Sequence, residues 1–224
     1  MAWVAAGLLV GYWAALTFVP VPGFGAGDFA EGRNLTNWID REFLPWRKWD
    51  TTHDPEGILS TLPAFASCLL GVFAGLLLKD PARTGERKAG LLVVAGCVSL
   101  AAGYAWGLQF PIVKKLWSSS FVLVAGGWSA LLLAAFYSVI AVKKIQGWSM
   151  PFVWVGTNAL TIYLVGNVLD FHALSARFVG GPIAEGLDAL VAPHFGAVVL
   201  AVTGMVLCFL LARFLYRRRI FLRL

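Results

Sequence analysis

The sequence predicts an all-α polytopic membrane helical bundle, a single transmembrane domain over residues 1–224 with about six spanning helices. Of its 224 residues, 59% are hydrophobic and 13% are charged, whereas a soluble domain typically carries about 25% charged residues. Six apolar segments each approach the roughly 20 residues that a helix needs to cross a bilayer. These segments are residues 2–19, 58–78, 89–108, 119–142, 152–169 and 195–215.

The basic residues predict the orientation, because cytoplasmic loops of membrane proteins are enriched in lysine and arginine. The turns after the second and fourth spans, together with the C-terminal tail, hold eleven basic and two acidic residues. The loops 20–57, 109–118 and 170–194 hold seven basic and ten acidic residues. We therefore expect both termini in the cytoplasm and these three loops outside. The net charge of +6 mostly reflects this bias, together with the basic tail Arg217-Arg218-Arg219, which is expected to contact anionic membrane lipid. No nucleic-acid partner is therefore expected.

The outward loop 20–57 follows the first span and is the longest segment outside the membrane. Its first residues, 20–27, are rich in proline and glycine, which predicts turns. Residues 34–41 are predicted to form a short amphipathic helix. Trp38, Trp46 and Trp49 suit the membrane interface, where tryptophan is enriched.

The loop ends in a charged segment, residues 53–57, at the mouth of the second span. Charge at the edge of the hydrocarbon is costly, so it usually serves a site or a tight pairing. We therefore predict catalytic roles for His53, Asp54 and Glu56, because imidazole titrates near neutral pH and acts as a general base.

A well-capped helix start is the alternative explanation of the same segment. Asp54 suits an N-cap and Pro55 suits the first helical position. On that basis we expect the helix to begin here, with Glu56 and Ser60 four residues apart on one face. We also expect a kink at Pro63, because proline lacks the N–H that the carbonyl four residues earlier needs.

The outward loop before the fourth span carries Lys114 and Lys115, against the usual charge bias. They are expected to counter the carboxylates of the first loop or to bind an anionic ligand. The alternative is a pair of snorkelling lysines with serines that cap the next helix. The substrate-binding candidates in this loop are Lys114, Lys115, Trp117 and Ser118.

The fifth span contains Asn158 near its middle, and a buried amide in hydrocarbon must find partners. Asn158 is therefore expected either to join helices or to bind a ligand. Asp170 and His172 follow the outer end of this span and are expected to reach the same external pocket as His53. A metal site built from His53, Asp54, Glu56 and His172 is not favoured by their spacing, and no metal is expected.

Several short motifs together resemble one known family. The most specific is Asp54-Pro55-Glu56-Gly57-Ile58-Leu59-Ser60-Thr61-Leu62-Pro63. Others are Val19-Pro20-Val21-Pro22-Gly23, Asn34-Leu35, Ile39-Asp40-Arg41, Lys114-Lys115-Leu116-Trp117-Ser118-Ser119-Ser120-Phe121 and Asn158-Ala159-Leu160-x-Ile162-Tyr163. From near residue 7 to about residue 165, the chain resembles the heparan-α-glucosaminide N-acetyltransferase family of polytopic membrane acyltransferases.

The resemblance implies a transfer of acetyl from cytosolic acetyl-CoA, or of another acyl group from its acyl-CoA, to a sugar or glycan outside. The family has many bacterial members, which implies a bacterial inner membrane. Asp54, Glu56 and Lys115 are expected to shape the acceptor end of a cavity, with Asn158 and Tyr163 in its wall. Trp117 and Ser118 also match motif positions. Lys143 and Lys144 are expected to meet the CoA phosphates, although membrane orientation also accounts for them.

Only the C-terminal portion of the family is matched, and the family's catalytic histidine lies upstream of that portion. Its role is therefore not transferred to His53 or His172. We expect the chain to be a fragment or to need a partner that supplies the N-terminal half, and a homodimer is also considered. Two rival functions are a transporter, suited by Asn158 and a kink at Pro63, and a non-catalytic membrane scaffold.

Overall fold

The computed structural model describes residues 1–45, 47–51 and 53–222, and in these residues it contains helices and no strands. The predicted all-α class is confirmed. Trp46, one of the predicted interface tryptophans, lies outside the residues that the structure describes. Contacts divide the chain into two compact units, Met1–Lys144 and Ile145–Leu224, which we describe separately. A single transmembrane domain over residues 1–224 stays a prediction.

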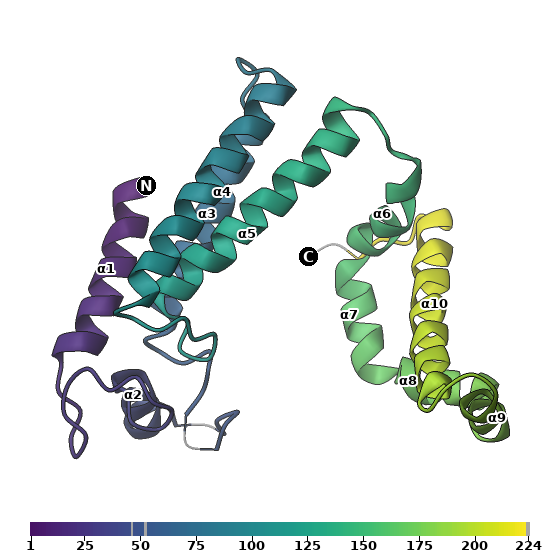
Figure 1. The fold of residues 1–224 in the computed structure, drawn as a ribbon, viewed down its shortest axis with the longest axis horizontal. Coiled ribbons are helices and arrows are strands. Elements are labelled where there is room, and N and C mark those ends of the chain that lie inside the picture. The colour runs from purple at the N-terminus through teal and green to yellow at the C-terminus, as the bar shows by residue number, and fades with distance from the viewer. Residues whose placement is uncertain (46, 52, 223–224) are drawn as a thin grey trace. The chain divides into compact units, whose positions relative to one another are not determined.

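The first unit contains five α-helices and one π-helical turn (Figure 1). They are α1 (Ala2–Phe18), α2 (Leu35–Phe43), α3 (Thr61–Lys79), α4 (Gly85–Gly107), α5 (Ser119–Tyr137) and η1 (Ser138–Val142). The second unit contains a 3-10 turn and five α-helices. They are η2 (Gly147–Ser149), α6 (Met150–Thr157), α7 (Ala159–Val168), α8 (Phe171–Val179), α9 (Pro182–Leu190) and α10 (Phe195–Arg217).

Four helices among the described residues are long and apolar enough to cross a membrane: α3, α4, α5 with η1, and α10. The pair α7 and α8, bent by 67°, would make a fifth span, and α1 is a shorter apolar helix of 17 residues. The chain is thus an integral membrane protein, and six spans is an approximate number. The predicted fifth span is broken at Asn158, and the predicted outward loop 170–194 instead forms α8 and α9.

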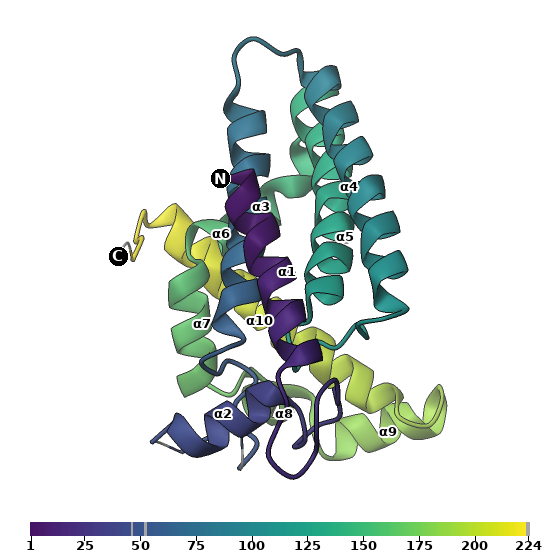
Figure 2. The ribbon, with the colours of Figure 1, turned by 90° about the vertical axis from the view of Figure 1, so that its left-hand side faces the viewer.

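Close helix packing gives the first unit its core, with α1, α3, α4 and α5 running side by side (Figures 1 and 2). A Cβ built on Gly96 of α4 would lie 2.9 Å from the Gly127 carbonyl oxygen of α5, so only glycine permits this approach. Nearby, Ser99 Oγ donates to the Leu123 carbonyl at 2.6 Å. Small residues and interhelical hydrogen bonds are the usual means of packing helices in a membrane.

A second core lies at the end of the first unit that carries α2, which we call the α2 end. Tyr12 of α1 is fully buried there with Leu16, Leu35, Phe110 and Leu116. The Tyr12 hydroxyl donates to the Leu116 carbonyl at 2.5 Å and lies 3.2 Å from Thr36 Oγ1. This contact joins α1, α2 and the loop before α5. The predicted amphipathic helix is confirmed as α2, whose N-cap Asn34 accepts from the Asn37 N–H.

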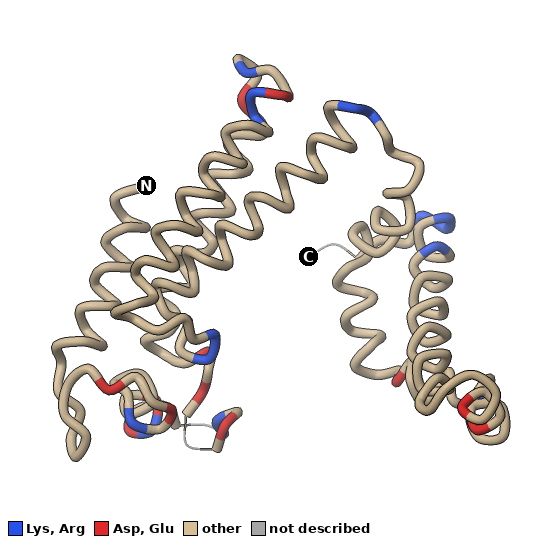
Figure 3. The backbone as a smooth tube through the Cα atoms, viewed as in Figure 1, with Lys and Arg blue, Asp and Glu red and all other residues tan. Residues whose placement is uncertain are grey.

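Charged residues of the first unit lie at its two ends. The turn between α3 and α4 carries basic and acidic residues, the segment after α5 carries basic residues, and the α2 end carries residues of both signs (Figure 3). The segment after α5 holds the exposed Lys143 and Lys144. This agrees with the charge pattern used to predict orientation, and the cytoplasmic position of the termini stays a prediction.

The predicted span 58–78 lies close to α3, but the predicted helix start at Asp54 and Pro55 is wrong. The helix α3 begins at Thr61, and Asp54 caps a turn by accepting the Glu56 N–H at 3.0 Å and the Trp49 N–H at 3.2 Å. Pro63 therefore falls in the first turn of α3, where its missing N–H costs nothing. The Leu62 N–H donates to the Leu59 carbonyl instead. The expected kink at Pro63 is absent, since α3 runs unbroken from Thr61 to Lys79.

Candidate functional site

The buried carboxylate of Asp40 organises the α2 end. Asp40 lies on α2, is 0% exposed, and accepts the Ile58 N–H on Oδ1 at 3.0 Å. A Cβ on Gly57 would lie 2.0 Å from Asp40 Oδ2, so the loop backbone rests directly on this carboxylate. Asp40 thus holds the end of the 54–57 turn, although the sequence did not single it out as a site residue.

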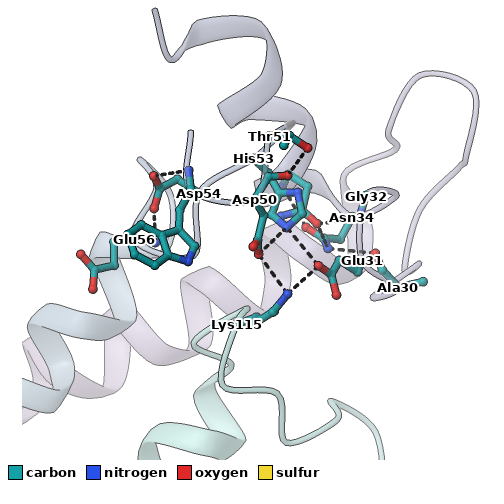
Figure 4. A network of polar contacts seen from close by, with 12 residues as sticks. Ala30, Glu31, Gly32, Asn34, Asp50, Thr51, His53, Asp54, Glu56 and Lys115 are labelled. Carbon is teal, nitrogen blue, oxygen red and sulfur yellow. Dashed lines mark hydrogen bonds and ion pairs between the residues drawn. The ribbon is translucent and has the colours of Figure 1, made fainter. Parts of the chain in front are cut away.

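Beyond this turn lies a pocket of about 270 Å³, which we call the Glu56 pocket. It is lined by Pro55, Glu56, Ser60, Thr61, Ala64 and Trp117. The Ser60 and Thr61 hydroxyls both donate to the Gly57 carbonyl, at 3.0 and 2.9 Å. Glu56 is exposed, and its side chain points away from His53 and Asp50 (Figure 4). Of the three predicted catalytic residues, Glu56 is the one with its carboxylate at this pocket.

Trp117 connects the Glu56 pocket to an apolar groove between α3 and α5. The groove has a volume of about 520 Å³, and Trp117 lines both hollows. Small residues line much of it, including Gly71, Ala74, Gly75 and Gly126. The Trp117 indole Nε1 donates to Ser67 Oγ of α3 at 3.1 Å. Its backbone φ of 51° is rare for a bulky residue, so strain is held at the junction.

His53 belongs to a separate cluster with Glu31, Asp50 and Lys115, which we call the His53 cluster (Figure 4). Lys115 Nζ lies 2.8 Å from Glu31 Oε1 and 3.0 Å from Asp50 Oδ2. These two carboxylates raise the pKa of Lys115, Glu31 more than Asp50. His53 Nε2 lies 3.6 Å from each carboxylate. Lys115 therefore does counter carboxylates of the first loop, but they are Glu31 and Asp50 rather than Asp54 and Glu56.

Three serines lie just before and at the start of α5, and their described hydrogen bonds stabilise the fold. Ser118 is the N-cap of α5 and accepts the Phe121 N–H at 3.3 Å. Ser119 donates to the Leu9 carbonyl and Ser120 to the Phe110 carbonyl, both at 2.7 Å. All three are fully buried. Lys114 is exposed beside them. Roles for Ser118 and Lys114 in substrate binding stay predictions.

The remaining predicted residues lie in the second unit. Asn158, 1% exposed, sits at the break between α6 and α7, and its amide atoms have no hydrogen-bond partner among the described residues. Tyr163 of α7 is exposed. Asp170 is the N-cap of α8 and accepts the His172 and Ala173 N–H groups. His172 is exposed. Their predicted roles in substrate binding stay predictions.

Burial raises the pKa of Asp40 above its usual range, while hydrogen bonds from the Ile58 and Asp54 N–H groups oppose the rise. A carboxyl group with a raised native pKa holds its proton more tightly when folded. Its stabilising contribution is therefore complete below the unfolded pKa of about 3.9 and is lost as the pH rises through the native pKa. We expect Asp40→Asn to remove this fall in stability with rising pH.

Thermal unfolding in detergent across that pH range measures the effect. Asp28→Asn is the matched control, because the Ala30 N–H and Arg33 lower the pKa of Asp28. The Asp28 carboxylate contributes to stability above its unfolded pKa, and this contribution is lost as the pH falls. Asp28→Asn should therefore change the dependence of stability on pH in the opposite direction to Asp40→Asn. If stability changed with pH in the same way in the wild type and in Asp40→Asn, the raised pKa assigned to Asp40 would be wrong.

Comparison with known proteins supports the resemblance that the motifs predicted. The heparan-alpha-glucosaminide N-acetyltransferase of Homo sapiens is 30% identical in an alignment that covers 75% of this chain. The predicted family resemblance is confirmed. The Mus musculus protein of the same name is 29% identical, with the same coverage. The match covers about 30% of the length of either relative. No family model matches the chain.

Proposed function

We propose that the chain is part of a transmembrane acyltransferase that moves an acetyl or other acyl group from cytosolic acyl-CoA to a sugar or glycan outside. The observation that carries this proposal is that Trp117 lines both the Glu56 pocket and the apolar groove. The carboxylate of Glu56 and the hydroxyls of Ser60 and Thr61 suit a hydroxylated acceptor, and an apolar groove suits an acyl chain and its thioester arm. The similarity to two N-acetyltransferases favours this use of the two hollows.

In this proposal, Glu56 serves the acceptor. The amine or hydroxyl of the acceptor attacks the acyl carbonyl, and CoA leaves as its thiolate. The Glu56 carboxylate takes the proton that the acceptor loses, which is general base catalysis. Asp54 positions Glu56 through the backbone, because its carboxylate accepts the Glu56 N–H at 3.0 Å and so fixes the turn. The Thr61 hydroxyl lies in the same pocket.

The groove serves the donor. It reaches Leu78, next to Lys79 at the end of α3, so it follows most of the helix. Phosphates of a CoA nucleotide would meet basic side chains beyond that end. Lys143 and Lys144, exposed after η1, are the candidates that we propose there. A charge-assisted contact from lysine to phosphate is stronger than a contact between neutral groups.

A groove-filling substitution tests the donor site. No described atom lies within 4 Å of a Cβ on Gly71, so Gly71→Leu fits while its side chain fills the groove. We expect acyl-CoA binding, measured by photolabelling in native membranes, to fall about tenfold or more. Gly90→Leu of α4 is the matched control, because a Cβ there also meets no described atom and the residue lies outside the groove. Equal labelling of the two variants would exclude the groove as the donor site.

The same proposal extends to what the chain needs for activity and to the membrane in which it lies. The match covers about 30% of the relatives' length. We propose that transfer needs a counterpart of the part that is not matched, supplied by a longer chain, by a partner protein or by a second copy in a homodimer. We also propose a bacterial inner membrane with both termini cytoplasmic, from the basic residues in Figure 3. Reporter fusions at each terminus test that orientation.

A transporter domain is the second candidate, and the break at the buried Asn158 favours it. Broken helices often form transport sites, because their ends expose backbone groups to a substrate. Uptake of a sugar by vesicles without any acyl transfer would support this candidate over the first.

A further inference from the structure

We propose that Glu31, Asp50 and His53 form a binding site for a divalent transition-metal ion, with Zn²⁺ as the expected occupant. The set offers one imidazole nitrogen and two carboxylate oxygens, the ligand types that Zn²⁺ accepts in three-ligand sites. No short ligand spacing in the sequence predicts this set, because Glu31 lies 22 positions before His53.

The geometry of the three ligand atoms fits a small ion. His53 Nε2 lies 3.6 Å from Glu31 Oε1 and 3.6 Å from Asp50 Oδ2. All three ligand atoms lie within 4.8 Å of one another. Bonds of about 2.0–2.1 Å around a tetrahedral ion place neighbouring ligands about 3.4 Å apart. Two of the three separations therefore need to contract by only a few tenths of an ångström.

A small cavity adjoins two of the three proposed ligands, Glu31 and His53, and Asp50 lies outside its lining. A cavity of about 50 Å³ is lined by Glu31, His53 and Lys115, together with Phe29, Asn34, Asn37, Val113 and Leu116. A single water molecule occupies about 30 Å³ in the liquid, so the cavity admits an ion with one water. The His53 side chain is only 5% exposed, which fixes the position of its ring, whereas Glu31 is 57% exposed and free to adjust.

Lys115 already places a positive charge between the two carboxylates, and this makes it the competitor of the metal. Its ammonium lies within 3.0 Å of both carboxylates, yet its side chain is 53% exposed. The side chain therefore reaches solvent without rearranging the core. Metal binding exchanges one cation for another at the same oxygens. The affinity of the site is then set by the strength of the Lys115 ion pairs.

Titration of the purified full chain with Co²⁺ tests the proposal, because cobalt in a three-ligand N/O site absorbs visible light. We expect one bound ion that excess Zn²⁺ displaces. Lys115→Met should bind about tenfold more tightly, while Lys114→Met should bind as the wild type does. His53→Gln and Asp50→Asn should each lose binding, with helix content checked by circular dichroism so that loss of ligand is distinguished from loss of fold.

Controls separate this site from other ligands in the chain. His172→Gln removes another histidine and should bind as the wild type does. Ligation by Cys68, Cys97 or Cys208 would add a strong thiolate absorption in the near ultraviolet. Unchanged binding in both His53→Gln and Asp50→Asn would overturn the proposal. So would the absence of binding in both the wild type and Lys115→Met.

Discussion

Replacing Glu56 with glutamine should abolish acyl transfer while leaving expression intact. The amide has the same shape as the carboxylate but takes no proton, and loss of a general base typically lowers a rate by about 10²–10⁴-fold. Glu56 is exposed, so the fold does not depend on its charge. The measurement is transfer of labelled acetyl from acetyl-CoA to an amino sugar by membranes that contain the native protein.

Glu42→Gln is the matched control for that experiment. Glu42 is an exposed carboxylate of α2, paired with Arg41 at 3.3 Å and outside the Glu56 pocket. Exposed ion pairs of this kind contribute little to stability, so transfer should continue at the wild-type rate. If Glu56→Gln transferred acetyl as fast as Glu42→Gln, Glu56 would have no catalytic role.

The largest expected effect on stability comes from Gly57→Ala. The added Cβ would lie 2.0 Å from Asp40 Oδ2 and 2.3 Å from Asp40 Cγ, far inside van der Waals contact. Asp40 cannot easily withdraw, because it is fully buried on α2 and is bonded to the Ile58 N–H. Overpacking in a core typically costs about 1–3 kcal/mol. Unfolding of the purified protein in detergent measures this loss.

Two further variants locate the cause of the loss in the contact with Asp40. Gly90→Ala adds a methyl group where no described atom lies within 4 Å, and it should change stability little. Combining Gly57→Ala with Asp40→Ala should cost less than the sum of the single changes, because the clash is gone. If the stability costs of Gly57→Ala and Asp40→Ala were strictly additive, the cost of Gly57→Ala would not come from contact with Asp40.

The long spanning helices α3, α4, α5 and α10 were predictable from sequence because apolar length marks a span, whereas the short helices α6 to α9 were not. The start of α3 was not predictable either. Asp54 and Pro55 have the local chemistry of a helix start, but the Ile58 N–H donates to Asp40, 18 positions earlier. A tertiary contact of that kind leaves no trace in the local pattern, so the turn and the position of Pro63 were misjudged.

The candidate site was only partly predictable for the same reason. The prediction that Lys114 and Lys115 counter carboxylates of the first loop holds for Lys115, and the catalytic roles predicted for Asp54 and Glu56 stay predictions. Glu31 and Asp50 were missed as the partners of Lys115 and His53, because each lies in a loop with no periodic pattern. Asp40 appeared in a motif, but its burial depends on how α2 packs.

The contacts of α1 fix an order of events during synthesis. The Tyr12 hydroxyl binds the Leu116 carbonyl, 104 positions later, and the Leu9 carbonyl accepts from Ser119, 110 positions later. Contacts between such distant residues form slowly, because a long loop must close first. The helix α1 is therefore synthesised well before these two partners. The Glu56 pocket is complete only after Trp117, which lines it, has been synthesised.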